Sequence, residues 1–127
     1  MKDFKKYYII PASPEEIYKA LTTETTIQLW TGDLVTMDAT AGGAFSMWDG
    51  AITGEFITLE PYNKIVQQWY FGEQEDKSIV TIKLHDHKKG TSIEVHQSNI
   101  PDEDYEDLID GWNNTYMASL MEFYEED

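Results

Sequence analysis

Hydrophobic positions near the end of the chain repeat at steps of three and four. They are large side chains, Tyr105, Leu108, Ile109, Trp112, Tyr116, Leu120 and Phe123. This spacing places them along one stripe, so the sequence predicts a long amphipathic helix from about Asp102 to Tyr124. Met117, Met121 and Tyr124 widen the stripe, which predicts that more than one element covers it.

Two other features of this helix bear on its packing. Gly111 lies inside the pattern and costs about 1 kcal/mol relative to alanine, which we interpret as the close approach of another backbone. Acidic residues fill the first turns, where they suit the positive end of the helix dipole. These residues are Asp102, Glu103, Asp104, Glu106 and Asp107.

The N-terminal part of the chain predicts a strand and two short helices. Phe4 to Ile10 is rich in aromatic and β-branched residues and predicts a strand. Ser13, Pro14 and Glu16 form a capping box with a first-turn proline, which predicts a helix from Pro14. A threonine-rich run then separates it from a second short helix, whose apolar residues are Ile27, Leu29 and Trp30.

From residue 31 to residue 95, short alternating segments are separated by turn residues, a pattern typical of antiparallel strands. The turns are Gly42-Gly43, Asp49-Gly50, Pro61-Tyr62-Asn63, Gly72 and Lys88-Lys89-Gly90. Gly54 interrupts the strand after Asp49-Gly50. It predicts a bulge or a sharp bend that curves the sheet.

The last hairpin allows a prediction of strand register. Its apolar alternate positions are Val80, Ile82, Leu84, Ile93 and Val95. Pairing Leu84 with Ile93 keeps all of them on one face, which we expect to look at the C-terminal helix. The same register sets Lys83 opposite Glu94 as an ion pair.

The predicted order is a strand, two short helices, about six antiparallel strands and a long helix. A sheet with one buried face needs a cover of matching size, and the last helix supplies it. The sequence therefore predicts an α+β helix-grip fold, a curved antiparallel sheet of about six to seven strands around a long C-terminal helix. We expect residues 1–127 to form a single domain of this kind.

Composition and charge narrow the choice of partners. The net charge is −15, with 24 acidic residues, nine lysines and no arginine. Such a chain repels nucleic acid and anionic membranes, so we expect neither as a partner. There is no cysteine, no signal peptide and no apolar run long enough for a membrane span, which predicts a cytoplasmic protein without disulfides.

A series of short motifs runs along the chain in a fixed order. They are Ser-Pro-Glu-Glu-Ile-Tyr at 13–18, Gly-Gly-Ala-Phe-Ser-Met-Trp-Asp-Gly at 42–50, Gly-Glu-Phe at 54–56, Leu-Glu-Pro at 59–61, Ile65-Val66 with Trp69 and Phe71, Gly90-Thr91, Ile100-Pro101, and Gly111-Trp112 with Tyr116. This series resembles, almost end to end, the C-terminal domain of the heat-shock protein 90 ATPase activator family. That domain belongs to the START-like, birch-pollen-allergen-like helix-grip superfamily. Tyr70 departs from the family, which usually places Arg between the Trp and the Phe.

The resemblance implies a non-enzymatic binding domain of a chaperone regulator in the stress response. Its partner would be the chaperone, another protein, or a hydrophobic small molecule held between sheet and helix. Activators of the family carry a further N-terminal domain that makes the main docking contact, and we expect no room for it in 127 residues. The acidic face of the last helix could dock a basic partner, or serve only the dipole and solubility.

Space between a curved sheet and one helix often holds an apolar ligand in helix-grip folds. We expect the cavity to be lined by large apolar residues, Trp30, Phe45, Met47, Trp69, Phe71, Trp112, Tyr116 and Met117. The alternative is that these rings simply fill the core. No cofactor is expected.

Two other kinds of site would depend on carboxylates or histidines. A small cyclase- or hydrolase-type enzyme would need a carboxylate in the cavity, and the candidates are Glu55, Asp33 and Asp38. A metal site would need the three histidines, His85, His87 and His96. The predicted register sets His96 roughly 13 Å from His85 along the strands, so we expect no metal site.

Overall fold

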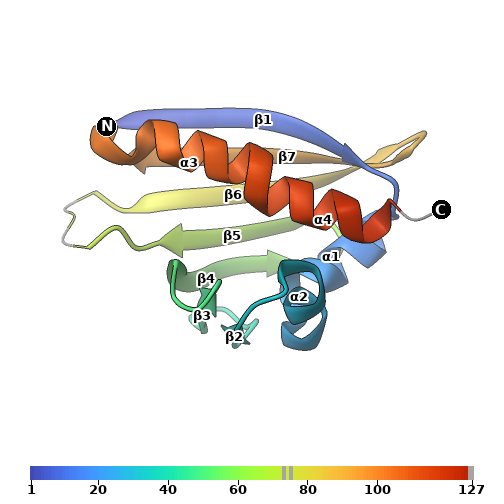
Figure 1. The fold of residues 1–127 in the computed structure, drawn as a ribbon. Helices are drawn as coiled ribbons and strands as arrows, with labels where there is room; N and C mark the ends of the chain where they lie inside the picture. Colours follow the sequence, from blue (N-terminus) through green and yellow to red (C-terminus); the bar gives the residue numbers. More distant parts are fainter. Residues whose placement is uncertain (73, 75, 126–127) are drawn as a thin grey trace.

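The helices and strands of the computed structural model follow the predicted order (Figure 1). The structure describes residues 1–72, 74 and 76–125. The elements are β1 (Lys2–Ile10), α1 (Pro14–Thr22), α2 (Glu24–Thr31), β2 (Thr36–Met37), β3 (Ala44–Met47), β4 (Ile52–Glu60), β5 (Lys64–Trp69), β6 (Ser78–His87), β7 (Gly90–Ile100), η1 (Asp102–Asp104), α3 (Tyr105–Gly111), η2 (Trp112–Tyr116) and α4 (Met117–Tyr124).

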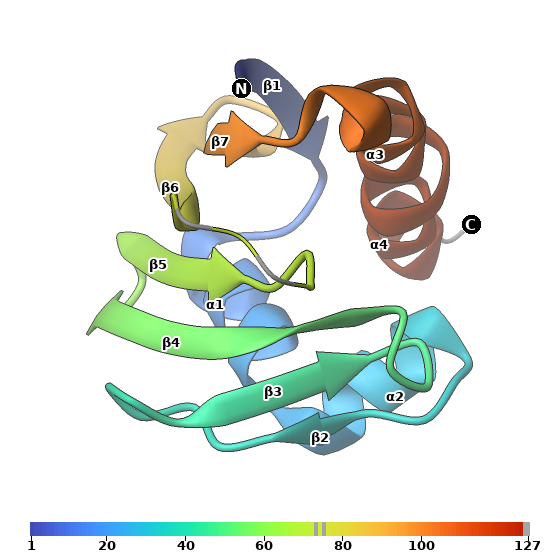
Figure 2. The ribbon, with the colours of Figure 1, turned by 90° about the vertical axis from the view of Figure 1, so that its left-hand side faces the viewer.

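The strands form one antiparallel sheet of seven, in the order β1-β7-β6-β5-β4-β3-β2. Seen from the side, the sheet curls around the C-terminal helix, which runs through α3, η2 and α4 (Figure 2). Helices α1 and α2 close the end of the sheet that lies under α4 (Figure 1). The predicted α+β helix-grip fold is confirmed.

The register of the last hairpin is the predicted one. Leu84 pairs with Ile93, and Lys83 pairs with Glu94. The apolar alternate positions of β6 and β7 are buried on the concave face of the sheet. A register shift by one residue would instead have turned all of them to solvent.

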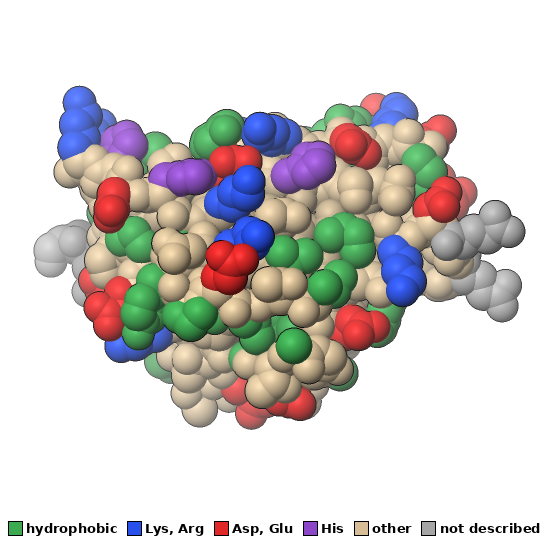
Figure 3. All heavy atoms as spheres, turned by 180° about the vertical axis from the view of Figure 1, so that it is seen from behind, with side chains coloured by type: hydrophobic (Ala, Val, Ile, Leu, Met, Phe, Trp, Pro, Cys, Tyr) green, Lys and Arg blue, Asp and Glu red, His purple; other side chains and the backbone are tan. Residues whose placement is uncertain are grey.

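The outer face of the sheet carries lysine and histidine side chains (Figure 3). Glu94 lies among them, with Oε1 2.9 Å from His85 Nε2 and Oε2 3.7 Å from Lys5 Nζ. The hydrogen bond from His85 lowers the pKa of the Glu94 carboxyl, and the nearby lysine charges act in the same direction. This face is therefore less acidic than the composition of the whole chain suggests.

A local capping signal explains where α1 begins, and a buried indole fixes α2 against it. Ser13 Oγ accepts a hydrogen bond from the Glu16 backbone N–H at 3.2 Å, the capping interaction that the sequence predicts. The indole N–H of Trp30 donates to the Ala20 carbonyl at 2.8 Å and ties the two helices together. Leu29 differs from the predicted apolar set, because it is 71% exposed.

The predicted bulge at Gly54 is wrong. Gly54 keeps a regular register with both neighbouring strands, and the irregularity in β4 falls between Phe56 and Thr58. A Cβ on Gly54 would lie 1.9 Å from the Gln68 carbonyl oxygen. The glycine therefore allows close packing of the sheet backbone, and the irregular register lies further along the strand.

The C-terminal helix is not a regular α-helix throughout. The Met117 N–H donates to the carbonyl of Trp112, five residues back, so Trp112–Tyr116 forms one π-helical segment. The predicted close approach at Gly111 is wrong, since nothing beyond its own helix lies within 4 Å of a Cβ built there. Gly111 instead leaves open space immediately before the π-helical segment.

Candidate ligand-binding cleft

A cleft of about 570 Å³ opens between the sheet and the first half of the C-terminal helix. Three parts of the chain form its walls: the β3–β4 turn with the start of β4, the end of β5, and the helix from η1 to η2. The lining residues are Trp48, Ala51, Ile52, Thr53, Trp69, Tyr70, Phe71, Asp104, Asp107, Leu108, Gly111, Trp112, Thr115 and Tyr116.

Stacked rings form the inner wall of the cleft. Trp69 of β5 and Trp112 of η2 lie nearly parallel, with their ring centroids 4.9 Å apart and an angle of 16° between them. Tyr116 packs against Trp112 at 4.6 Å and against Trp48 at 5.7 Å. The π-helical segment keeps Trp112 and Tyr116 on the same side of the helix, where both rings face the sheet.

Buried amides hold the two stacked indoles in place. The Trp69 indole N–H donates to Gln67 Oε1 and the Trp112 indole N–H donates to Gln97 Oε1, both at 2.9 Å. Gln97 is itself fixed, because its amide donates to Ser78 Oγ at 3.0 Å. With both donors satisfied inside the protein, the ring orientations are set before any ligand arrives.

The inner wall contains one further polar side-chain group, the Tyr116 hydroxyl. Tyr116 is only 3% exposed, yet no residue that the structure describes forms a hydrogen bond with its hydroxyl. Among the described residues, no fully buried side-chain oxygen or nitrogen lacks a partner, so this oxygen keeps some access to solvent, and Tyr116 lines the cleft. Burial raises the pKa of the phenol far above its usual value, so it stays a neutral donor.

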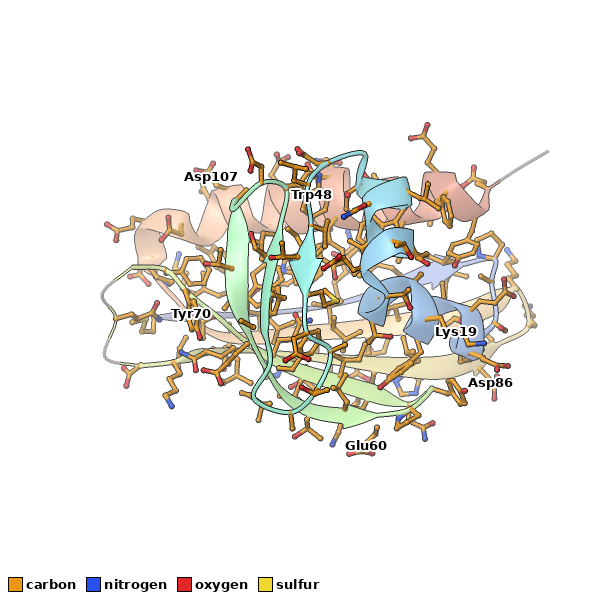
Figure 4. The ribbon with its side chains drawn as sticks, turned by 90° about the horizontal axis from the view of Figure 1, so that it is seen from below. Lys19, Trp48, Glu60, Tyr70, Asp86 and Asp107 are labelled. Carbon is orange, nitrogen blue, oxygen red and sulfur yellow. The ribbon has the colours of Figure 1, made fainter. Side chains whose placement is uncertain are left out.

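The rim of the cleft is polar and acidic. Asp104 is half-buried, and Asp107 and Thr115 are exposed on the helix side. Tyr70, opposite them, is 47% exposed and donates to Glu55 Oε1 at 3.1 Å. Figure 4 shows Asp107, Trp48 and Tyr70 arranged around this side of the molecule.

Of the eight residues expected to line the cavity, Trp69, Phe71, Trp112 and Tyr116 line the cleft. The other four do not. Phe45, Met47, Met117 and Trp30 are buried in the core, and the Trp30 ring contacts two lining residues, Tyr116 at 5.3 Å and Trp48 at 5.8 Å.

Trp48 is a lining ring that is absent from the expected set. The sequence placed Phe45 and Met47 in that set but left open which of the alternate faces from Phe45 to Trp48 points inward. Trp48 and Asp49 both have positive φ angles, 51° and 53°, so alternation ends at Met47 and the turn carries the Trp48 ring back toward Tyr116. The adjacent Asp49-Gly50 turn was the signal that could have indicated this.

The structure gives no support to the enzyme hypothesis at the carboxylates named for it. Glu55, Asp33 and Asp38 do not line the cleft, and Asp33 and Asp38 are exposed. The three histidines do not converge either, since His96 pairs with Thr81, four residues from His85. Over residues 1–72, 74 and 76–125, no group of three metal-ligating side chains could hold an ion.

The motifs noted in the sequence are part of a match that covers most of the chain. The sequence profile described as "Activator of Hsp90 ATPase homolog 1-like protein" matches residues 11–125. The chain belongs to this activator family. Within the described part of the chain, no helix has the length and apolar character needed to cross a bilayer.

Curated relatives of the family are longer proteins. The chain is 32% identical over 114 residues to "Activator of 90 kDa heat shock protein ATPase homolog 1" of Homo sapiens, covering 88% of this chain and 34% of that protein. The homologue from Dictyostelium discoideum is 32% identical over 111 residues, which are 85% of this chain and 29% of that protein. The chain thus spans about a third of the length of these relatives.

Solved structures share the fold along nearly the whole chain. An HSP90 activator from Plasmodium falciparum superposes with a TM-score of 0.83 at 27% identity, over 93% of this chain and 92% of that chain. The Aha1 dimer from Colwellia psychrerythraea superposes with a TM-score of 0.82 at 21% identity, over 98% and 97% of the two chains. The second likeness concerns the fold alone.

Proposed function

We propose that this chain is a non-enzymatic binding domain that takes an apolar, ring-containing small molecule into the cleft. The observation that carries the proposal is the wall of stacked rings, in which the Tyr116 hydroxyl has no hydrogen-bond partner among the described residues. A ligand atom that accepts a hydrogen bond from this hydroxyl would fix the orientation of the ligand at the inner wall.

The size and chemistry of the cleft support this proposal. Its volume of about 570 Å³ lies within the range of small-molecule sites, which are about 300–1,000 Å³. Such sites are mostly apolar with a few fixed polar groups, and here the indoles held by Gln67 and Gln97 need no rearrangement to receive a ring.

The test uses 1-naphthalenemethanol, a neutral two-ring molecule with one hydroxyl. It is titrated into the protein while the indole N–H signals of Trp69 and Trp112 are followed by NMR. We expect saturable shifts of both signals. Gly111→Phe should abolish them by filling the cleft, because space at Gly111 is open.

Ala118→Phe is the matched control, since Ala118 is exposed on the same helix and does not line the cleft. It should leave the titration unchanged. Absence of saturable shifts in the wild type, or equal effects of the two phenylalanine variants, would remove the proposal.

A second candidate function is regulation of a cytoplasmic chaperone of the heat-shock protein 90 class. The relatives named as activators of its ATPase favour this role at 32% identity. The experiment measures chaperone ATPase turnover with and without this chain. A rise in turnover supports the role, and unchanged turnover at a high molar excess of the chain counts against it.

A further inference from the structure

We infer that the cleft selects small aromatic cations over anions of the same shape. This inference rests on the proposed binding function and adds the charge of the ligand to it. It comes from the charges at the rim, the rings behind them and the buried hydroxyl at the inner wall.

The charges at the rim are of one sign. Asp104 and Asp107 line the cleft, and none of its lining residues is a lysine or a histidine. Neither aspartate takes part in an ion pair with any residue that the structure describes. Asp102 is different, because the N-terminal ammonium lies 3.0 Å from its carboxylate and lowers its pKa.

The two carboxylates are placed by the helix itself. Asp104, Asp107, Gly111 and Thr115 follow one another at steps of three and four, so they form one edge of the helix along the cleft. Figure 4 shows Asp107 at this edge and Trp48 on the β3–β4 turn beside it. The two carboxylates and the Trp48 ring therefore line the same cleft.

This combination favours a positive charge at the mouth. A cation near the Trp48 or Tyr70 ring gains about 0.5–1 kcal/mol from the π system at a partly exposed site. A partly exposed carboxylate adds a similar amount, about 0.2–1 kcal/mol. An anion meets two like charges, and none of the described lining residues carries a positive charge.

Dipole compensation explains acidic residues in the first turns without any ligand. Glu103 and Glu106 lie in the same turns but do not line the cleft, and both are exposed. They therefore serve as matched controls. A general effect of helix charge would appear equally in both pairs, whereas recognition of a ligand would depend on Asp104 and Asp107 alone.

The experiment compares three probes with one ring system: 1-naphthylmethylammonium, 1-naphthalenemethanol and 1-naphthoate. Affinities are measured at neutral pH by calorimetry and by the Trp69 and Trp112 indole shifts, in about 20 mM salt and again in about 300 mM salt. The proteins are the wild type, D104N/D107N and E103Q/E106Q.

We expect the cation to bind about ten-fold more tightly than the anion in low salt, with the neutral probe between them. High salt should reduce this ratio in the wild type. D104N/D107N should bring the ratio close to one while the neutral probe keeps its affinity. E103Q/E106Q should retain most of the wild-type ratio.

Each contrary result has a separate meaning. If the neutral probe binds but the cation and anion do not differ, the charge inference is overturned and the binding function stands. If both double variants reduce the ratio equally, the rim carboxylates do not recognise the ligand. If no probe shifts either indole signal, the proposed binding function itself fails. Should D104N/D107N not fold, the salt dependence of the wild type decides.

Discussion

The two halves of the C-terminal helix contrast sharply. In the second half, Met117 and Leu120 are fully buried, and α4 contacts α2 and β1. The Tyr124 hydroxyl also donates to the Glu16 carbonyl of α1 at 3.4 Å. In the first half, α3 has no fully buried residue, and its inner edge carries Asp107, Leu108 and Gly111 along the cleft.

The contrast shows what opens the cleft. The apolar stripe continues through both halves, so hydrophobicity alone does not separate them. The second half is covered by α1 and α2 in addition to the sheet (Figure 1), whereas the first half faces the sheet with no covering helix. A glycine at 111 then leaves unfilled the space that a larger side chain would occupy.

Replacing a leucine by alanine in each half of the helix should give the largest difference in the free energy of unfolding. Leu120→Ala empties a fully buried site and should lower the free energy of unfolding by about 2–5 kcal/mol. Leu108→Ala removes a half-buried side chain at the cleft and should cost only about 1 kcal/mol. Urea unfolding of both variants measures the difference, and equal losses would mean that the cleft end is as tightly packed as the other.

Removing the amide side chain that holds Trp112 should give the next largest loss of stability. Gln97→Ala leaves the Trp112 indole N–H without its partner and removes a donor to the Ser78 hydroxyl, which still donates to the Ser98 carbonyl, at a cost of about 1–3 kcal/mol. Gln68→Ala is the control, since Gln68 is half-exposed and lies on β5, with β6 between it and the strand of Gln97. A loss no greater than that of the control would show that the indole does not depend on Gln97.

Gly111→Ala should stabilise the protein by about 0.5–1 kcal/mol, because Gly111 has a helical φ of −60° and open space around its Cβ position. The same change at Gly54 should destabilise it, because the added Cβ would lie 1.9 Å from the Gln68 carbonyl oxygen. Thermal and urea unfolding compare the two. Destabilisation by Gly111→Ala would indicate that another backbone does approach Gly111 closely, as the sequence predicted.

The smallest effect should come from Tyr116→Phe at neutral pH, within about 0.5 kcal/mol, because its hydroxyl has no partner among the described residues. Tyr8→Phe should cost about 1 kcal/mol, since the Tyr8 hydroxyl donates to Asn113 Oδ1 at 2.8 Å. A loss at Tyr116 as large as at Tyr8 would indicate a hidden hydrogen bond.

The stability of the protein at alkaline pH should depend on the two buried phenols, those of Tyr116 and Tyr8. Burial raises the pKa of Tyr116 and raises that of Tyr8 to about 12, from an unfolded value of 10.0. Each therefore contributes stability that is complete below pH 10.0 and is lost as the pH rises through the folded pKa. Urea unfolding at increasing pH should show this fall, and Tyr116→Phe should make it shallower. An unchanged pH dependence would count against the buried phenol.

The sequence predicted the parts of the fold that depend on local patterns. The register of β6 and β7 followed from polarity alone, because a shift by one residue would bury Lys83 and expose Leu84. The start of α1 followed from Ser13 and Glu16, whose capping contacts involve only neighbouring residues. Both features are decided within a few residues of chain.

Features that depend on tertiary packing were missed. The spacing of Trp112 and Tyr116 fits an α-helix and a π-helical segment equally well, so the sequence could not distinguish them. The close approach of another backbone that the sequence predicted at Gly111 occurs at Gly54 instead, while Gly111 meets open space. Trp48 was not among the expected lining residues, because strand alternation does not extend through a turn with positive φ angles.

The parallel pair of Trp69 and Trp112 gives the protein an optical signature of its own. Two indoles with centroids 4.9 Å apart and planes within 16° share their excited states. Their circular dichroism in the ultraviolet is therefore that of a coupled pair, and it depends on their separation and tilt. Any molecule that enters the cleft and disturbs this stack would change the spectrum without a label, so occupancy can be followed in the unmodified protein.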